Sequence, residues 1–430
     1  MSKILNYLLF FISLIFLIFT IFKSEVYWGG INRFSYLPHY FIFLSTIILS
    51  LKINSFKKDI QIIILTSIYT IILSSLSFEG YIHLKQNKQV SPKKNLTLEF
   101  LYNEKKKIND DISIVSTAFF FDKSLTQDLF PLSGKSLSET IHCKESDYYS
   151  IYFSDRYGFN NPDHEWDKDD INYLLIGDSY VHGACVNRPN DIGSVLRKLS
   201  GKSVLNLGYD GNGPLLEYAT LREYFKKGSK NLLWFYYEQN DLDDLAKELQ
   251  NKILKEYLND DNFSQNLRSK QNKINEIQKQ FAENHYSFEN TDNTVNSFDI
   301  FKFIKLTKTR SMLSQNVNIY KFANKKKPQK DFIEILKKVS LFAKKNNINL
   351  YFIYLPTFER YNNNLNFNKS DVIELIRELE INFIDIDLEV FQKQIDPKKL
   401  YVNSETNHYN EYGYFLVTKK IYEIINNENK

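Results

Sequence analysis

The chain reads Tyr-Leu-Leu-Ile-Gly-Asp-Ser-Tyr-Val-His-Gly over residues 173–183. An apolar run ends there in a Gly-Asp-Ser turn, and helix-compatible residues follow. This order predicts a buried strand, a tight turn and the start of a helix, with Ser179 at the carboxyl end of the strand. The start of a helix favours negative charge, and the backbone N–H of Ser179 can donate to an oxyanion. We therefore expect the Ser179 hydroxyl to act as a nucleophile.

A base for this serine is found near the other end of the chain. Residues 405–413 read Glu-Thr-Asn-His-Tyr-Asn-Glu-Tyr-Gly, so a carboxylate precedes His408 by three residues. A nucleophile, a base and an orienting acid are the parts of serine-based acyl transfer, and Ser179, His408 and Glu405 are the candidates. His182 is a rival base. Its position three residues after the serine rarely gives the needed alignment, so we expect it at the helix start or in the wall of the site.

Two more predicted strand ends carry hydrogen-bond donors. Residues 204–213 run from an apolar strand into a glycine-rich loop that contains Gly211, and residues 232–241 form an aromatic strand that ends in Asn-Asp at Asn240. In an open parallel sheet, ligands bind outside the carboxyl ends of the strands. We therefore expect an oxyanion hole with three donors, which are the backbone N–H groups of Ser179 and Gly211 and the side-chain amide of Asn240.

In this order, the four segments resemble the sequence blocks of the SGNH (GDSL-type) hydrolases, a family named for a serine, a glycine, an asparagine and a histidine. The matching positions are Ser179 in Gly-Asp-Ser, Gly211 in Asn-x-x-x-x-Gly, Asn240 in x-x-Asn-Asp and His408 in acid-x-x-His. Two positions depart from the pattern. The third block usually begins with glycine where this chain has Glu238, and the last usually carries aspartate where this chain has Glu405. The resemblance covers roughly residues 150 to 430.

The fold class follows from a repeated strand-turn-helix pattern. Apolar runs are found at residues 173–176, 203–207, 231–237, 349–355 and 382–386. Alternation of this kind indicates a parallel sheet covered by helices. Together with the resemblance, it implies an α/β fold with a flavodoxin-like, five-stranded parallel sheet and flanking helices, preceded by N-terminal transmembrane helices.

Three apolar segments lie at the N-terminus, at residues 4–22, 36–51 and 60–78. A helix of about twenty residues crosses a bilayer, and the first segment lacks a signal-peptide cleavage site. The second is interrupted early by Pro38 and His39. We expect three membrane spans rather than a buried helical core, because the segments are consecutive and polar residues gather only between them.

The lysines around these segments predict the orientation. Lys3 precedes the first span, and Lys52, Lys57 and Lys58 lie between the second and third. Positive charge favours the cytoplasmic side. We therefore expect a multi-pass protein of the cytoplasmic membrane, with its N-terminus in the cytoplasm and its catalytic domain on the extracytoplasmic side.

Three regions follow from this organisation. Residues 1–79 form the membrane region, 80–150 a polar connector, and 151–430 a hydrolase-like domain with a helical insertion at about 241–330. Apolar residues recur in the insertion at helical spacing. A lid or wall over the site, a solvated arm and a dimer contact all fit that pattern. The acids at 241, 243 and 244 are expected to cap the start of a helix rather than take part in chemistry.

The composition limits the classes of partner and cofactor that we expect. The net charge is only +4 and lysine is spread along the chain, so we expect no nucleic-acid partner. The histidines do not fall at ligand spacing with acids or thiols, so neither a metal nor another cofactor is expected. The chain has two cysteines, Cys143 and Cys185. In an exported domain they would form a disulfide, although two free thiols fit the sequence as well.

The predicted function is that of a membrane-anchored serine esterase of the SGNH type. It would act through an acyl-serine on an O-acyl ester of an envelope glycan, a lipid or a small molecule. An O-acyltransferase with the same site is one alternative, and a non-catalytic protein of the same fold that binds or assembles a glycan is another. The presence of all four block residues favours an enzyme.

Overall fold

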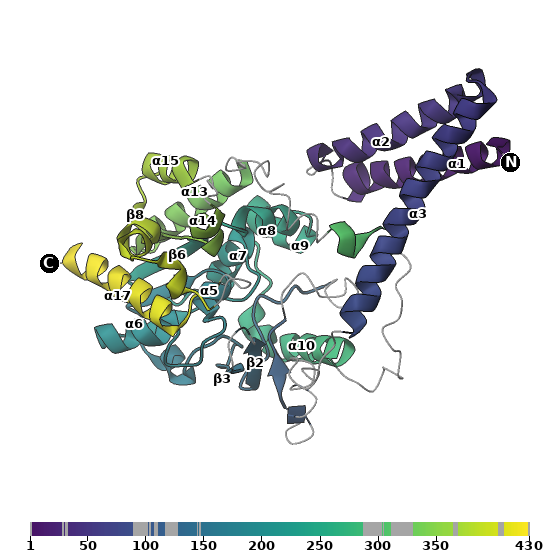
Figure 1. Ribbon diagram of the computed structural model, residues 1–430. Coiled ribbons are helices and arrows are strands. Elements are labelled where there is room, and N and C mark those ends of the chain that lie inside the picture. Colours follow the sequence, from purple (N-terminus) through teal and green to yellow (C-terminus); the bar gives the residue numbers. More distant parts are fainter. Residues whose placement is uncertain are drawn as a thin grey trace. The chain divides into compact units, whose positions relative to one another are not determined.

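The computed structural model describes residues 2–27, 30, 33–88, 102, 105–106, 111–116, 128–143, 145, 148–286, 303, 305–310, 330–363, 369–402 and 408–428. The chain forms two compact units (Figure 1). Residues 1–91 and 294–320 make up one unit, called the membrane unit after its expected spans, and residues 92–293 and 321–430 make up the other, called the catalytic unit after the expected site residues.

Three long helices build the membrane unit: α1 (Ser2–Ile21, continued by a wider turn over Phe22–Tyr27), α2 (Arg33–Lys52) and α3 (Lys58–Lys88). All three are long and apolar enough to cross a membrane. At most 22% of the most apolar stretch of each is buried within the described part of the protein, so most of these apolar side chains are left uncovered there. Asn6 and Ser50 hydrogen-bond α1 to α2, with Nδ2 of Asn6 3.0 Å from the Ser50 carbonyl oxygen.

Part of the predicted insertion belongs to the membrane unit. The backbone N–H groups of Lys308 and Thr309 donate to the carboxylate of Glu79, near the C-terminal end of α3, at 2.9 and 2.7 Å. The Thr309 hydroxyl donates to the same carboxylate at 2.6 Å. The Lys305 ammonium lies 5.3 Å from the centre of the Phe19 ring, near the C-terminal end of α1. This segment therefore packs on the C-terminal parts of the first and third apolar spans.

The catalytic unit is built on five parallel strands: β4 (Tyr173–Ile176), β5 (Val204–Asn206), β6 (Asn231–Tyr237), β7 (Asn349–Leu355) and β8 (Asn382–Asp385). Their order is β5-β4-β6-β7-β8, with every neighbouring pair parallel. This is the order of flavodoxin-like sheets. The prediction of a five-stranded parallel sheet with flanking helices is confirmed.

Alternate residues of each strand enter two separate cores. Leu174 and Trp234 face one core, and Leu175 and Phe235 face the other, as the two-residue period of a strand requires. The first core is covered by α7 (Pro214–Tyr224), α13 (Lys330–Lys345) and α15 (Lys369–Glu378). The second is covered by α6 (Ile192–Ser200) and α17 (Glu411–Glu428), which lie side by side (Figure 1). Helices on both faces explain why β4 and the interiors of β6 and β7 carry apolar residues on both faces.

The first part of the insertion completes the core. It folds into α8 (Asp241–Glu248), α9 (Lys252–Asn259) and α10 (Gln271–Tyr286). Leu245, Leu254 and Tyr257 are fully buried, and both α8 and α9 pack against α7. Up to residue 286, the apolar residues at helical spacing thus fill the interior of the catalytic unit. They form neither a lid nor a solvated arm.

A small second sheet differs from the expected connector. It contains β1 (Ser113–Ile114), β2 (Glu139–Cys143) and β3 (Ser150–Phe153), with β1 parallel and β3 antiparallel to β2. Ile114 and Ile141 share a core with Ala282 of α10. The described part of residues 92–150 therefore belongs to the catalytic unit, and α3 extends to Lys88. Strands of two to five residues are too short to show a clear period in the sequence.

Candidate active site

Ser179 lies on a tight strand-to-helix turn. After β4, Asp178 precedes the short helix α5 (Ser179–His182) and accepts a hydrogen bond from the N–H of Tyr180 at 3.0 Å. A Cβ atom on Gly177 would lie 2.4 Å from Cγ2 of Val181, so only glycine allows this close turn. The turn presents Ser179 beyond the carboxyl end of β4, where the sequence predicts it.

His408 contacts the serine from a segment 229 residues away. Its Nε2 atom is 2.8 Å from Oγ of Ser179. The rings of Tyr180 and Tyr409 pack together with centroids 4.6 Å apart, and the Tyr180 ring also packs on His408 at 5.1 Å. These aromatic contacts hold the imidazole at the start of α5. The arrangement matches that of an activated serine and its base.

The acid that contacts His408 is Glu145, which the sequence analysis did not identify. Its Oε1 atom lies 2.8 Å from Nδ1 of His408. When Nδ1–H donates to this carboxylate, Nε2 is left unprotonated and can accept the Ser179 proton. Nδ1 carries one proton, and it donates that N–H to Glu145. Glu405, the expected acid, lies outside the described residues.

The surroundings of His408 shift its pKa. Burial lowers the pKa of the imidazole, but the hydrogen bond and charge of Glu145, with the charges of Asp210 and Asp178, outweigh burial, so the pKa is raised from its usual value. Burial also raises the pKa of Asp178 to about 7. A base with a raised pKa loses activity at a higher pH on acidification than an unperturbed histidine.

A disulfide connects the acid's segment to the nucleophile's loop. Cys143, two residues before Glu145, is bonded to Cys185, six residues after Ser179, and their Cα atoms are 5.3 Å apart. Sγ of Cys185 is 3.7 Å from Nδ1 of His408. Glu145, Cys185 and His408 lie close enough to suggest a metal site. A disulfide sulfur is a poor metal ligand compared with a thiolate, so this set does not fit a metal ion.

Replacing both cysteines by serine is expected to lower both stability and activity. The disulfide closes a loop of 42 residues, and losing such a cross-link typically costs about 2–4 kcal/mol of unfolding free energy. It also frees the segment that holds Glu145, so kcat should fall. Thermal unfolding and ester hydrolysis by the full chain, with and without reductant, measure the two effects. Unchanged activity in the double variant would show that Glu145 keeps its place without the disulfide.

The expected oxyanion donors follow neighbouring strands. Ser179 follows β4, Gly211 follows β5 and Asn240 follows β6, and β4 lies between the other two strands. Gly211 has a positive φ of 76°, which the tight loop after β5 requires. Because parallel strands end at the same edge of a sheet, the three donors gather at one edge. This is the edge at which His408 contacts Ser179.

His182 is a buried structural residue. Its Nε2 atom is 2.8 Å from the Tyr152 hydroxyl, and its Nδ1 atom accepts the backbone N–H of Asp210 at 3.1 Å. Burial holds the pKa of His182 well below its usual value. The ring is therefore neutral, and both of its nitrogens are engaged away from Ser179. It supports the loop that carries Gly211 and does not compete with His408.

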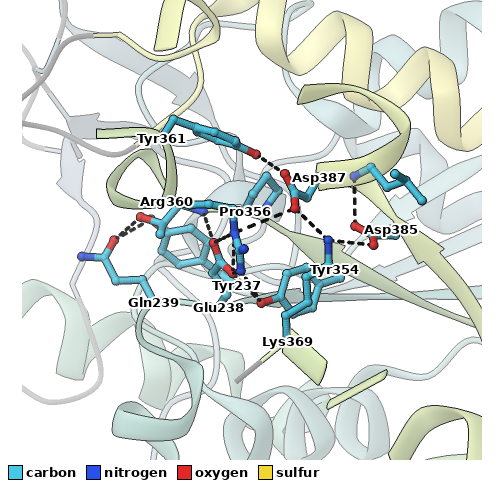
Figure 2. A network of polar contacts seen from close by, with 12 residues as sticks. Tyr237, Glu238, Gln239, Tyr354, Pro356, Arg360, Tyr361, Lys369, Asp385 and Asp387 are labelled. Carbon is cyan, nitrogen blue, oxygen red and sulfur yellow. Dashed lines mark hydrogen bonds and ion pairs between the residues drawn. The ribbon is translucent and has the colours of Figure 1, made fainter. Parts of the chain in front are cut away.

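Glu238, which departs from the family pattern, is an anchor at the end of β6 (Figure 2). Its carboxylate is fully buried and accepts hydrogen bonds from Nε of Arg360 at 2.9 Å and from the backbone N–H of Thr357 at 2.8 Å. The Tyr354 hydroxyl donates to it as well. The side chain thus ties the end of β6, two residues before Asn240, to the segment after β7.

The same network continues to the end of β8. Lys369 lies between Asp385 and Asp387, with its Nζ atom 2.8 and 2.7 Å from their carboxylates. Asp387 also accepts the Tyr361 hydroxyl at 2.6 Å (Figure 2). Buried charges of this kind are stable only when they are paired and hydrogen-bonded. We interpret the network as a brace for the carboxyl edge of the sheet.

A hollow of about 400 Å³ adjoins the histidine. Its lining consists of Tyr148, Cys185, Val186, Val402, Asn410, Glu411 and Tyr412. Cys185 in this lining contacts His408. Residues 410–412 come two to four positions after His408 in the chain. The Tyr148 hydroxyl donates to the Glu411 carboxylate at 3.0 Å across the lining. Its size is within the range of small-molecule sites.

No family model matches the chain, and no curated protein matches it. Among solved structures, the chain is similar to one described as a lipolytic protein of the G-D-S-L family from Desulfitobacterium hafniense DCB-2. The two chains share 13% identical residues over 59% of this chain and 99% of the other, with a TM-score of 0.31. This likeness is too distant to support a statement about function, which therefore rests on the geometry around Ser179 and His408.

Proposed function

We propose that this chain is a membrane-anchored serine ester hydrolase of the SGNH type. The observation that carries the proposal is the continuous line of contacts from Oγ of Ser179 to Nε2 of His408 and from Nδ1 of His408 to Glu145, each 2.8 Å long. These three side chains come from distant parts of the chain, and their order is that of nucleophile, base and orienting acid.

The reaction follows from these positions. Nε2 of His408 takes the proton of Ser179 as Oγ attacks the ester carbonyl carbon. The oxyanion accepts hydrogen bonds from the N–H groups of Ser179 and Gly211 and from the Asn240 amide. His408 then gives its proton to the departing alcohol as the ester C–O bond breaks. Water, deprotonated by His408, attacks the acyl-serine and releases the acid and Ser179.

O-acyl transfer is the second candidate. An alcohol that replaced water in the second half of the reaction would accept the acyl group, with the same residues in the same roles. The hollow that Cys185 lines favours this candidate, because the tyrosine, asparagine and glutamate side chains in part of its lining suit a hydroxylated group such as a sugar. The substrate class in this proposal is an O-acyl ester of an envelope glycan, a lipid or a small molecule.

The membrane unit supports an extracytoplasmic site. The predicted cytoplasmic lysines lie at the start of α1 and around the junction of α2 and α3. Glu79 and the contacts of Lys305 lie at the opposite ends of α1 and α3. The segment 305–310 comes from between α10 and α13 of the catalytic unit, so the chain returns to those ends. By the positive-inside rule, these ends face away from the cytoplasm.

A fluorophosphonate probe tests the proposal. We expect the purified full chain in detergent to be labelled, and Ser179→Ala to lose all labelling, because the probe requires an activated serine. Product analysis with p-nitrophenyl acetate, in water and with added sugar alcohols, then separates hydrolysis from transfer. A folded wild-type chain that is not labelled would contradict the proposal and favour a non-catalytic binding protein.

A further inference from the structure

Helix α8 carries two buried carboxylates toward the segments that hold the expected oxyanion donors. Oδ2 of Asp244 accepts a hydrogen bond from Nδ2 of Asn240 at 2.8 Å. One turn later, Oε1 of Glu248 accepts the backbone N–H of Gly213 at 2.6 Å, and its Oε2 accepts that of Leu215 at 2.9 Å. Helix α8 therefore contacts both Asn240 and the loop that carries Gly211.

The contact between Asp244 and Asn240 determines which way the amide faces. An asparagine side chain has a donor end and an acceptor end. If the Asn240 amide turned over, its Oδ1 atom would face the Asp244 carboxylate, and two acceptors would repel each other. Within the described part of the chain, Oδ1 of Asn240 is buried with no hydrogen-bond partner. Asp244 is therefore the contact that selects this orientation, and it leaves the second N–H of Nδ2 for another acceptor.

Lys247 is a second partner of Asp244 and favours its carboxylate form. Nζ of Lys247 lies 2.6 Å from its Oδ1 atom. Burial raises the pKa of Asp244 above its usual value, and the contacts with Lys247 and Asn240 only partly oppose that shift. A carboxylate accepts hydrogen bonds only, whereas its protonated form can also donate and would accept either orientation of the amide.

The loop of the second block is packed against the same helix. A Cβ atom on Gly213 would lie 2.9 Å from Cβ of Asp244 and from Oε1 of Glu248. The loop therefore approaches α8 as closely as glycine permits, two residues after Gly211. Glu248, fully buried, closes this contact with its two backbone hydrogen bonds.

We propose that α8 positions the oxyanion hole, with Asp244 orienting the Asn240 amide and Glu248 fixing the loop that carries Gly211. Both are positioning residues, because neither touches the reacting atoms. The inference rests on the proposed function, since it gives Asn240 and Gly211 their roles. It also assigns a purpose to the first helix of the insertion, which follows Asn240 directly.

A double-mutant cycle tests the role of Asp244 in the full chain with a soluble p-nitrophenyl ester. Asn240→Ala should lower kcat by about 10²- to 10³-fold, the usual effect of losing one oxyanion donor. Asp244→Ala should lower kcat about tenfold or more with little change in KM, because orientation matters most in the transition state. In the Asn240→Ala background, Asp244→Ala should cost less than about twofold, because the amide it orients is gone.

Asp243→Ala is the matched control. Asp243 is an exposed carboxylate in the same turn of α8, and its removal should change kcat by less than about twofold. Asp244→Asn keeps the size of the side chain if the alanine variant folds poorly, and it should show the same lack of additivity. Losses that add across the cycle, or a fully active Asp244 variant, would overturn the inference. Full activity of Asn240→Ala would instead overturn the oxyanion role of Asn240, on which the inference depends.

Discussion

His408→Ala is expected to lower kcat for ester hydrolysis by about 10⁵- to 10⁶-fold, the size of effect seen when a serine nucleophile loses its base. The alanine cannot take the Ser179 proton, and no other described side chain contacts that hydroxyl through a hydrogen bond. Steady-state hydrolysis of a soluble ester measures the loss. The thermal unfolding midpoint of the same preparation shows whether the fold is kept.

His164→Ala provides the control for His408. The His164 side chain is 67% exposed, and its one described ionic contact is with Glu165 at 3.6 Å. Its removal should leave kcat within about twofold, as expected for an exposed position away from the site. A loss smaller than about tenfold in His408→Ala, in a folded protein, would show that another group serves as the base.

Glu145→Gln is expected to lower kcat by about 10³- to 10⁴-fold, as for the loss of the orienting acid in other serine enzymes. The amide keeps the size of the side chain, but it no longer stabilises the imidazolium that forms during the reaction. It also permits the tautomer that leaves Nδ1 unprotonated, in which Nε2 cannot accept the Ser179 proton. Hydrolysis at a pH above the acid limb isolates this effect.

The same variant should move the acid limb of the pH profile. Activity requires neutral His408, so it falls as the pH drops through the pKa of the imidazole. In the wild type Glu145 raises that pKa against the effect of burial. Without the carboxylate, burial prevails and the pKa falls, so the acid limb of kcat/KM should shift to lower pH.

Glu405→Gln is the comparison that separates the two glutamates. If Glu145 is the orienting acid, Glu405→Gln should retain most of the activity that Glu145→Gln loses. The reverse ranking would restore Glu405 to the role that the sequence predicts. Both variants change one carboxylate to an amide, so any difference between them reflects position and not chemistry.

The sequence predicts Glu405 as the orienting acid and the structure has Glu145 in contact with His408, and this difference has a physical origin. Glu405 precedes His408 by three residues, and within one segment spacing is the guide to contact that a sequence offers. Glu145 contacts His408 from 263 residues away. One signal pointed to it, because Cys143 and Cys185 were expected to pair and Glu145 is two residues from Cys143.

For the insertion, too, the sequence predicts the helices but not their packing. Its apolar residues at helical spacing predicted helices correctly, but the same spacing suits a lid, an arm or a packed layer. Burial of Leu245 and Tyr257 against α7 decides among these choices. Asp244 was expected to cap a helix, whereas in the structure it binds the Asn240 side chain.

The sequence by itself determined the five parallel strands and the placement of Ser179, Gly211 and Asn240 at strand ends, because these depend on local apolar runs and on turns that only certain residues form. The three apolar helices follow from segment length and composition. Only the tertiary structure decided that Glu145 meets His408, that Glu238 braces β6 and that α8 contacts Asn240. Those contacts join residues whose separation along the chain, or whose side-chain direction, carries no local signal.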